Sequence, residues 1–214
     1  MAFSDWKRTD DKEPSTIHRG ETSTTPIHTA VGKALSEWEH MESGLTRLFQ
    51  LLCESPSFAA SRAYGTLESS YAKAGLLRAA MEVFFSSRSA INSRDHKDTK
   101  TLLAAYESAQ QFRNNIAHGM AVGFHLKNGQ HSGYFLCPPS YATKKVAKID
   151  PREIYVLGAR YWYTAQDIQH YAARVTEMLA ETMRLIQEIN KKYQVLRDSQ
   201  FHPQCFPPLG DTCL

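Results

Sequence analysis

Apolar residues recur every three or four positions along several stretches of the chain, which is the spacing of one face of an α-helix. The first stretch ends before Pro56, and the residue before a proline disfavours helical conformation. The pattern therefore predicts one long amphipathic helix. Its apolar positions are Val31, Leu35, Trp38, Met41, Leu45, Leu48, Phe49 and Leu52.

Two further stretches have the same spacing and predict a second and a third helix. The polar residues 86–95 between them predict a loop. Gly119 follows the third stretch, and we expect it to end that helix in the left-handed conformation that glycine readily adopts. The apolar positions are Leu67, Tyr71, Ala74, Leu77, Met81, Phe84 and Phe85 in the second stretch, and Leu102, Leu103, Tyr106, Ala109, Phe112 and Ile116 in the third.

The spacing changes after Gly119. Residues 120–126 and 132–137 flank the segment 127–130 (KNGQ), whose Asn-Gly pair predicts a tight β-hairpin. Residues 153–163 are rich in Ile, Tyr, Val and Trp and predict a third strand. Thr164 and Asp167 have the spacing of a helix-start cap. A fourth long helix is predicted after them from Ile168, Tyr171, Val175, Met178, Leu179, Met183, Ile186, Ile189 and Tyr193.

These elements predict a mainly α protein: an up-down four-helix bundle with a small β-hairpin or three-stranded insertion between its third and fourth helices. We place this helical domain at residues 27–194. Residues 1–26 and 195–214 lack periodic apolar positions, so we expect them to be flexible tails. A chain of 214 residues is compatible with a single hydrophobic core.

The composition predicts a folded protein, because 42% of the residues are hydrophobic and only 22% are charged. Residues 1–25 contain no apolar run typical of a secretory signal, and no later stretch is long enough to span a bilayer. We therefore expect a soluble, cytoplasmic protein that does not act at a membrane. The four cysteines are far apart and form no Cys-x-x-Cys or Cys/His cluster, which predicts neither a zinc site nor a disulfide framework. We also expect no cofactor.

One polar segment, residues 113–118 (RNNIAH), lies at the end of the third predicted helix. Residues 197–202 (RDSQFH) repeat its Arg-x-x-x-x-His spacing, but that copy precedes Pro203 in the predicted C-terminal tail. The first copy ends an amphipathic helix instead. It is also surrounded by positive charge, since residues 113–160 contain seven basic and two acidic residues, a surplus of five. Context therefore favours residues 113–118 as the functional copy.

With this segment at the end of the third of four helices, the chain resembles the HEPN superfamily, whose signature is an arginine, often followed by Asn, Asp or His, and then a histidine. Arg113, Asn114 and His118 match that signature. The resemblance covers about residues 29–193. It implies metal-independent RNA cleavage at a composite site between two protomers, in a toxin or phage-defence role. Some HEPN proteins that pair with nucleotidyltransferases have a tyrosine two residues after the histidine, where this chain has Met120.

The three matching residues suit this chemistry. RNA cleavage without a metal needs a base, an acid and a cation that stabilises the charged phosphate. Histidine can serve as base or acid, and arginine can grip a phosphate. Because one histidine cannot readily do both jobs, we expect a homodimer that brings two copies of Arg113 and His118 together. We thus predict Arg113, Asn114 and His118 as catalytic residues, RNA as the substrate, and an antitoxin or other protein as a further partner.

Helical geometry constrains how these side chains meet. At about 100° per residue, Asn114 and His118 differ by roughly 40° around the helix, and Arg113 lies roughly 140° from His118. We expect Asn114 to sit against the imidazole of His118. The long side chain of Arg113 would have to curl toward the same space.

Other interpretations remain open at this point. Asn114 and Asn115 would then merely fray the helix, His118 would cap it, and Arg113 would bind a carboxylate such as that of Glu107. The chain would in that case be a purely structural dimerisation domain. A further alternative is a non-catalytic HEPN-like module that binds RNA, a nucleotide or a protein partner through Arg113.

Overall fold

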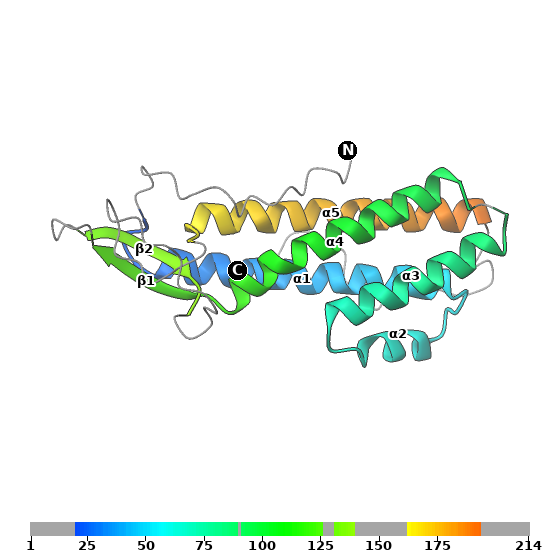
Figure 1. Cartoon of the computed structure of the whole chain (residues 1–214), viewed down its shortest axis with the longest axis horizontal. Coiled ribbons are helices and arrows are strands. Elements are labelled where there is room, and N and C mark those ends of the chain that lie inside the picture. Colours follow the sequence, from blue (N-terminus) through cyan, green and yellow to red (C-terminus); the bar gives the residue numbers. More distant parts are fainter. Residues whose placement is uncertain (1–19, 90, 126–130, 140–161, 194–214) are drawn as a thin grey trace, which may run out of the picture.

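The computed structural model describes residues 20–89, 91–125, 131–139 and 162–193, and the structural statements below concern these residues. They form a mainly helical protein with a small antiparallel sheet (Figure 1). In chain order the elements are α1 (Thr25–Leu52), α2 (Phe58–Gly65), α3 (Ser70–Ser86), α4 (Arg94–Ala117), β1 (Met120–His125), β2 (His131–Cys137) and α5 (Ala165–Tyr193).

The four long helices α1, α3, α4 and α5 form where the apolar spacing predicts them. The predicted cap of the last helix is also present, because Thr164 N donates to Asp167 Oδ2 at 2.9 Å and Asp167 N donates to Thr164 Oγ1 at 3.2 Å. The short helix α2 was not predicted. Only Tyr64 among its residues is buried, so it has no apolar stripe that a sequence could reveal.

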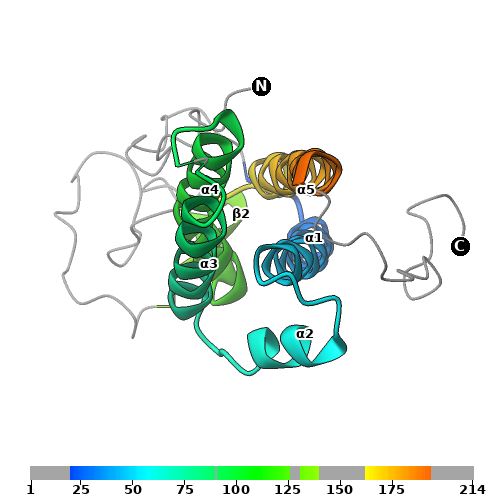
Figure 2. The same ribbon diagram turned by 90° about the vertical axis from the view of Figure 1, so that its right-hand side faces the viewer.

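α1 and α5 lie side by side over most of their length. α3 and α4 form a second pair that packs against one face of the first (Figures 1 and 2). Small side chains allow α1 and α5 to come close. A Cβ atom on Gly44 of α1 would lie only 2.7 Å from Leu179 Cδ1 of α5. The core between the helices includes the fully buried side chains of Trp38, Tyr106 and Leu77.

Successive long helices do not alternate in direction throughout, which corrects the predicted up-down order. Ion pairs join Glu42 to Lys73 and Glu54 to Arg88, so α1 and α3 run in the same direction. The physical reason is α2, which returns the chain along the outside before α3 begins (Figure 1). α4 runs opposite to α5, since Asp95 at its start binds Lys192 at the end of α5.

β1 and β2 form the predicted hairpin, with Met120 opposite Cys137 and Gly123 opposite Tyr134. The turn residues 127–130 lie outside the described part of the chain. The predicted third strand is described only at its end, where Tyr163 forms an isolated bridge with Leu136 of β2. The sheet of the described residues therefore has two strands, and residues 153–161 lie outside them.

The two predicted tails lie almost entirely outside the described residues, which begin at Gly20 and end at Tyr193. α1 begins at Thr25, two residues before the predicted domain boundary. Within the described ranges, no helix is both long enough and apolar enough to cross a membrane.

A buried polar cluster holds α1, α3 and α4 together. Glu42 is 8% exposed, and its carboxylate accepts hydrogen bonds from Lys73 Nζ at 2.8 Å and from Tyr106 Oη at 2.5 Å. Burial and the negative charge of Glu42 raise the pKa of Tyr106, so its hydroxyl remains a donor. The Tyr106 ring also stacks on Trp38, with centroids 5.1 Å apart.

Lys73→Met is expected to lower the free energy of unfolding by about 3 kcal/mol, because it leaves a buried carboxylate without its cation. Urea denaturation measures this change. The matched control is Lys100→Met, because Lys100 pairs with Glu82 where both side chains are 53% exposed. This variant should lose less than about 1 kcal/mol. Equal losses in the two variants would contradict a stabilising role for the buried pair.

Candidate functional site

The Arg-Asn-x-x-x-His segment occupies the last turns of α4, as predicted. The helix ends at Ala117, and His118 is its C-cap residue with φ −107° and ψ 6°. The His118 backbone N–H donates to Asn114 O at 3.0 Å, which closes the last turn. The side chains of Asn114 and His118 are exposed, and that of Arg113 is half-buried.

The side chain of Arg113 contacts that of its neighbour Asn114. Its Nη1 donates to Asn114 Oδ1 at 3.3 Å, whereas its Nε is buried and forms no hydrogen bond with the protein. The alternative partner Glu107 is bound by Arg78 of α3 instead. Within the described ranges Arg113 forms no salt bridge, so its charge is not neutralised there by a carboxylate.

The expected contact between Asn114 and the His118 imidazole is not formed as a hydrogen bond in the described structure. That expectation assumed that the regular helix continues through residue 118. The backbone of His118 has already left helical geometry, so the angle calculated for a continuous helix does not apply to its side chain. The structure therefore brings the side chains of Arg113 and Asn114 together, and within the described residues no hydrogen bond joins either of them to the His118 imidazole.

An aromatic stack that sequence reasoning missed supports this end of α4. The Phe112 ring stacks with two tyrosine rings, and its centroid lies 6.0 Å from that of Tyr163 and 5.9 Å from that of Tyr171. Burial raises the pKa of Tyr171, and the positive charge of Arg113 opposes that rise. Asn115 Nδ2 also donates to Tyr163 Oη at 3.1 Å. Nothing in the spacing of the sequence relates Tyr163 to residue 112 or 115.

Gly119 has a different role from the predicted one. Its φ does not lie in the left-handed region, so the expected left-handed helix end is wrong. A glycine is needed here because the sheet approaches closely. A Cβ atom on Gly119 would lie 2.6 Å from Leu136 Cγ and 2.9 Å from Asn115 O.

Exposed apolar side chains follow the segment directly. Met120 is 52% exposed and Val122 is 37% exposed, and the alternation of a strand places both on one face of β1. The other basic residues of the predicted positive surplus all lie outside the described part of the chain. These residues are Lys127, Lys144, Lys145, Lys148, Arg152 and Arg160. The second copy of the spacing, residues 197–202, also lies outside it.

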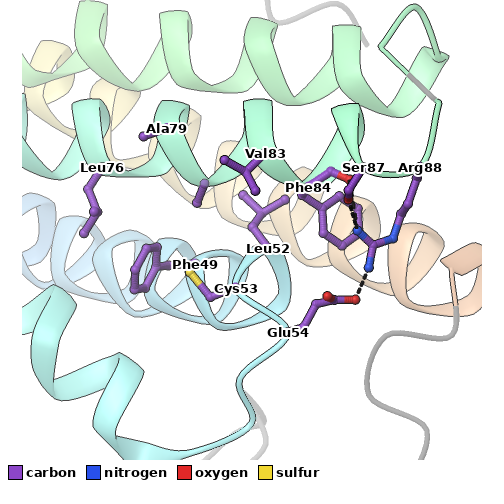
Figure 3. A pocket seen from close by; sticks show the side chains of 11 residues that line it. Phe49, Leu52, Cys53, Glu54, Leu76, Ala79, Val83, Phe84, Ser87 and Arg88 are labelled. Atoms are coloured by element: carbon purple, nitrogen blue, oxygen red, sulfur yellow. Dashed lines mark hydrogen bonds and ion pairs between the residues drawn. The ribbon is translucent and has the colours of Figure 1, made fainter.

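An open, largely apolar hollow lies elsewhere, between the C-terminal halves of α1 and α3 (Figure 3). Arg88 crosses one end of it, where its guanidinium binds Glu54 and lies 4.0 Å from the centroid of the Phe84 ring. Cys53 also lines the hollow, but burial raises the pKa of its thiol, which makes the reactive thiolate scarcer at neutral pH. None of the residues that line the hollow belongs to the candidate site.

Neither a group of metal ligands nor a similarity to a known protein assigns a function to this site. In the described part of the chain, no three His, Cys, Asp or Glu residues are grouped so that they could hold a metal ion. No protein-family model matches the chain, and no curated protein or solved structure matches it. The candidate site therefore rests on its residues and their geometry.

Proposed function

We propose that the protein is a cytoplasmic HEPN-type endoribonuclease whose four-helix bundle consists of α1, α3, α4 and α5. It cleaves RNA without a metal and acts as a toxin or phage-defence effector. The observation that carries the proposal is the end of α4, where a guanidinium that no described carboxylate neutralises lies five residues before an exposed histidine. A cation for the phosphate and a group for proton transfer are the two requirements of this reaction.

In the proposed reaction the ribose 2′-oxygen attacks the adjacent phosphorus while a His118 imidazole takes the 2′-hydroxyl proton. The bond from phosphorus to the 5′-oxygen breaks, and a protonated His118 gives its proton to that oxygen. Arg113 stabilises the added negative charge on the phosphate, and Asn114 orients the guanidinium through its amide oxygen. The products are a 2′,3′-cyclic phosphate and a 5′-hydroxyl.

Two histidines are required because base and acid act in the same step, and each chain supplies one His118 at this position. A two-fold dimer provides both. The exposed Met120 and Val122 next to His118 support a contact between chains here, because exposed apolar side chains grouped together mark interaction surfaces. The active site would then form only at the dimer interface.

The proposal is tested with purified protein and RNA oligonucleotides in EDTA. We expect cleavage that leaves 2′,3′-cyclic phosphate ends, identified by mass spectrometry. An oligonucleotide with one 2′-deoxyribose should remain intact at that position, since the attacking hydroxyl is missing. Cleavage at the deoxyribose would contradict the mechanism, and the absence of any cleavage would contradict the proposed activity.

The composite site makes a separate prediction for mixed dimers. If both copies of His118 serve one site, an equal mixture of wild-type and His118→Ala chains should retain about a quarter of the wild-type activity, because random pairing leaves about a quarter of the dimers intact. Sites within single chains would retain about half. Co-refolding of the two chains, with tags that verify exchange, allows the rates to be compared at one total concentration.

The non-catalytic alternative is favoured by one observation, the lack of a hydrogen bond between His118 and either Arg113 or Asn114 among the described residues. A module that only binds RNA, a nucleotide or a protein partner such as an antitoxin would need Arg113 but not His118. It predicts RNA binding that weakens with salt, without turnover. The two functions are separated by measuring binding and cleavage on the same oligonucleotide.

A further inference from the structure

We infer that Tyr163 and Asn115 are positioning residues of the candidate site, which lock the Arg113–His118 segment of α4 to strand β2. The inference rests on the proposed function, because it assigns these residues a part in placing Arg113 and His118 for RNA cleavage. Neither residue belongs to the arginine-histidine signature.

The first connection is between Tyr163 and the sheet. Tyr163 N donates to Leu136 O, and Leu136 N donates to Tyr163 O, both at 2.9 Å. This pair of hydrogen bonds fixes Tyr163 against the edge of β2 that faces away from β1, because β1 pairs with the other edge. The backbone of Tyr163 is thus held to the hairpin.

The second connection is between Tyr163 and the helix. Its ring stacks on Phe112 with an interplanar angle of 28°, and its hydroxyl accepts the hydrogen bond from Asn115. Phe112 precedes Arg113 directly, and Asn115 follows it by two residues. One tyrosine therefore holds the helix on both sides of the arginine, through its ring on one side and its hydroxyl on the other.

The third connection closes the other end of the segment. Leu136 is the bridge partner of Tyr163, and its Cγ lies 2.6 Å from the position of a Cβ atom on Gly119, the residue that follows His118. Residues 113–118 are therefore bracketed by two contacts to a single β-bridge, one from Tyr163 before the segment's midpoint and one from Leu136 after its end. The hairpin and the end of α4 are therefore joined at both ends of the segment that contains Arg113 and His118.

Tyr163→Phe tests this inference because it keeps the ring, the stacking on Phe112 and the backbone bridge, and removes only the hydroxyl that accepts from Asn115. We expect kcat to fall by about ten- to a hundredfold with little change in KM, since small misplacement of catalytic groups slows chemistry more than binding. The matched control is Tyr134→Phe, on the same strand β2, which should leave kcat unchanged.

A double-mutant cycle tests whether Asn115 and Tyr163 act through each other. Asn115→Leu should lower kcat by a similar factor, and Asn115→Leu combined with Tyr163→Phe should be no slower than either single variant. If the kcat losses of the two single variants multiplied in the double variant, the two residues would act independently, and the proposed connection would be overturned. Equal losses in Tyr163→Phe and Tyr134→Phe would also overturn it.

A readout that does not depend on cleavage separates this inference from the proposed function. The NMR signals of the Arg113 Nε–H and the His118 imidazole should shift in Tyr163→Phe and stay in place in Tyr134→Phe. If the wild-type protein cleaves no RNA, the proposed function fails while these signals still report on positioning. If the signals do not move in Tyr163→Phe, the positioning role fails whatever the activity.

Discussion

Replacing His118 with alanine is expected to slow RNA cleavage by about 100- to 10,000-fold, which is the range that general acid-base groups contribute. In the proposed dimer the substitution removes the base and the acid together, so the loss should lie toward the upper end. RNA binding should change little, because the imidazole is exposed and makes no hydrogen bond to Arg113 or Asn114 in the described structure. Single-turnover rates with saturating protein in EDTA measure the chemical step directly.

The matched control for this variant is His40→Ala. His40 is also an exposed histidine on a long helix, and it lies near the middle of α1 instead of at the end of α4. Its replacement should leave the rate within about twofold of the wild type, since surface substitutions away from a site have small effects. A wild-type rate in His118→Ala would exclude the imidazole from the reaction.

Replacing Arg113 with lysine is expected to slow cleavage by about 100- to 1,000-fold, although the positive charge is kept. The guanidinium is planar and offers several N–H donors in fixed directions, so it can bind a phosphate while it also donates to Asn114. An ammonium group cannot reproduce this geometry. Arg113→Ala should also weaken RNA binding, because a phosphate contact is lost and the dependence of affinity on salt becomes less steep.

Arg94→Lys serves as the control at the opposite end of the same helix. Arg94 begins α4, and its side chain is 84% exposed. The same chemical change there should leave cleavage unaltered. If Arg113→Lys also keeps full activity, the arginine acts only as a diffuse charge, and the mechanism proposed for it is wrong.

The helices were predictable because each of the four long ones buries one face, so its apolar residues repeat with the period of the helix. The Thr164–Asp167 cap was predictable for a local reason, since its hydrogen bonds join residues three positions apart. The direction of α3 was not predictable. It depends on α2, which has a single buried residue, Tyr64, and therefore leaves no period in the sequence.

The candidate site shows the same division between local and distant information. The segment from Arg113 to His118 was placed correctly on its helix because the run of apolar positions ends there. The contacts that surround it were missed, since they join residues far apart in the chain. Asn115 and Tyr163 are 48 positions apart, and no local pattern relates them. Gly119 was recognised as important, but its actual reason, the approach of Leu136, is a tertiary contact.

The pairing of α1 with α5 has a consequence for how the chain folds. The most extensive helix packing joins the first and last helices of the described structure, so this pair closes a chain loop of more than a hundred residues. During synthesis the apolar face of α1 cannot pack against α5 until α5 has left the ribosome. Folding should therefore be late and cooperative, and an incomplete chain that lacks α5 would expose this face to aggregation.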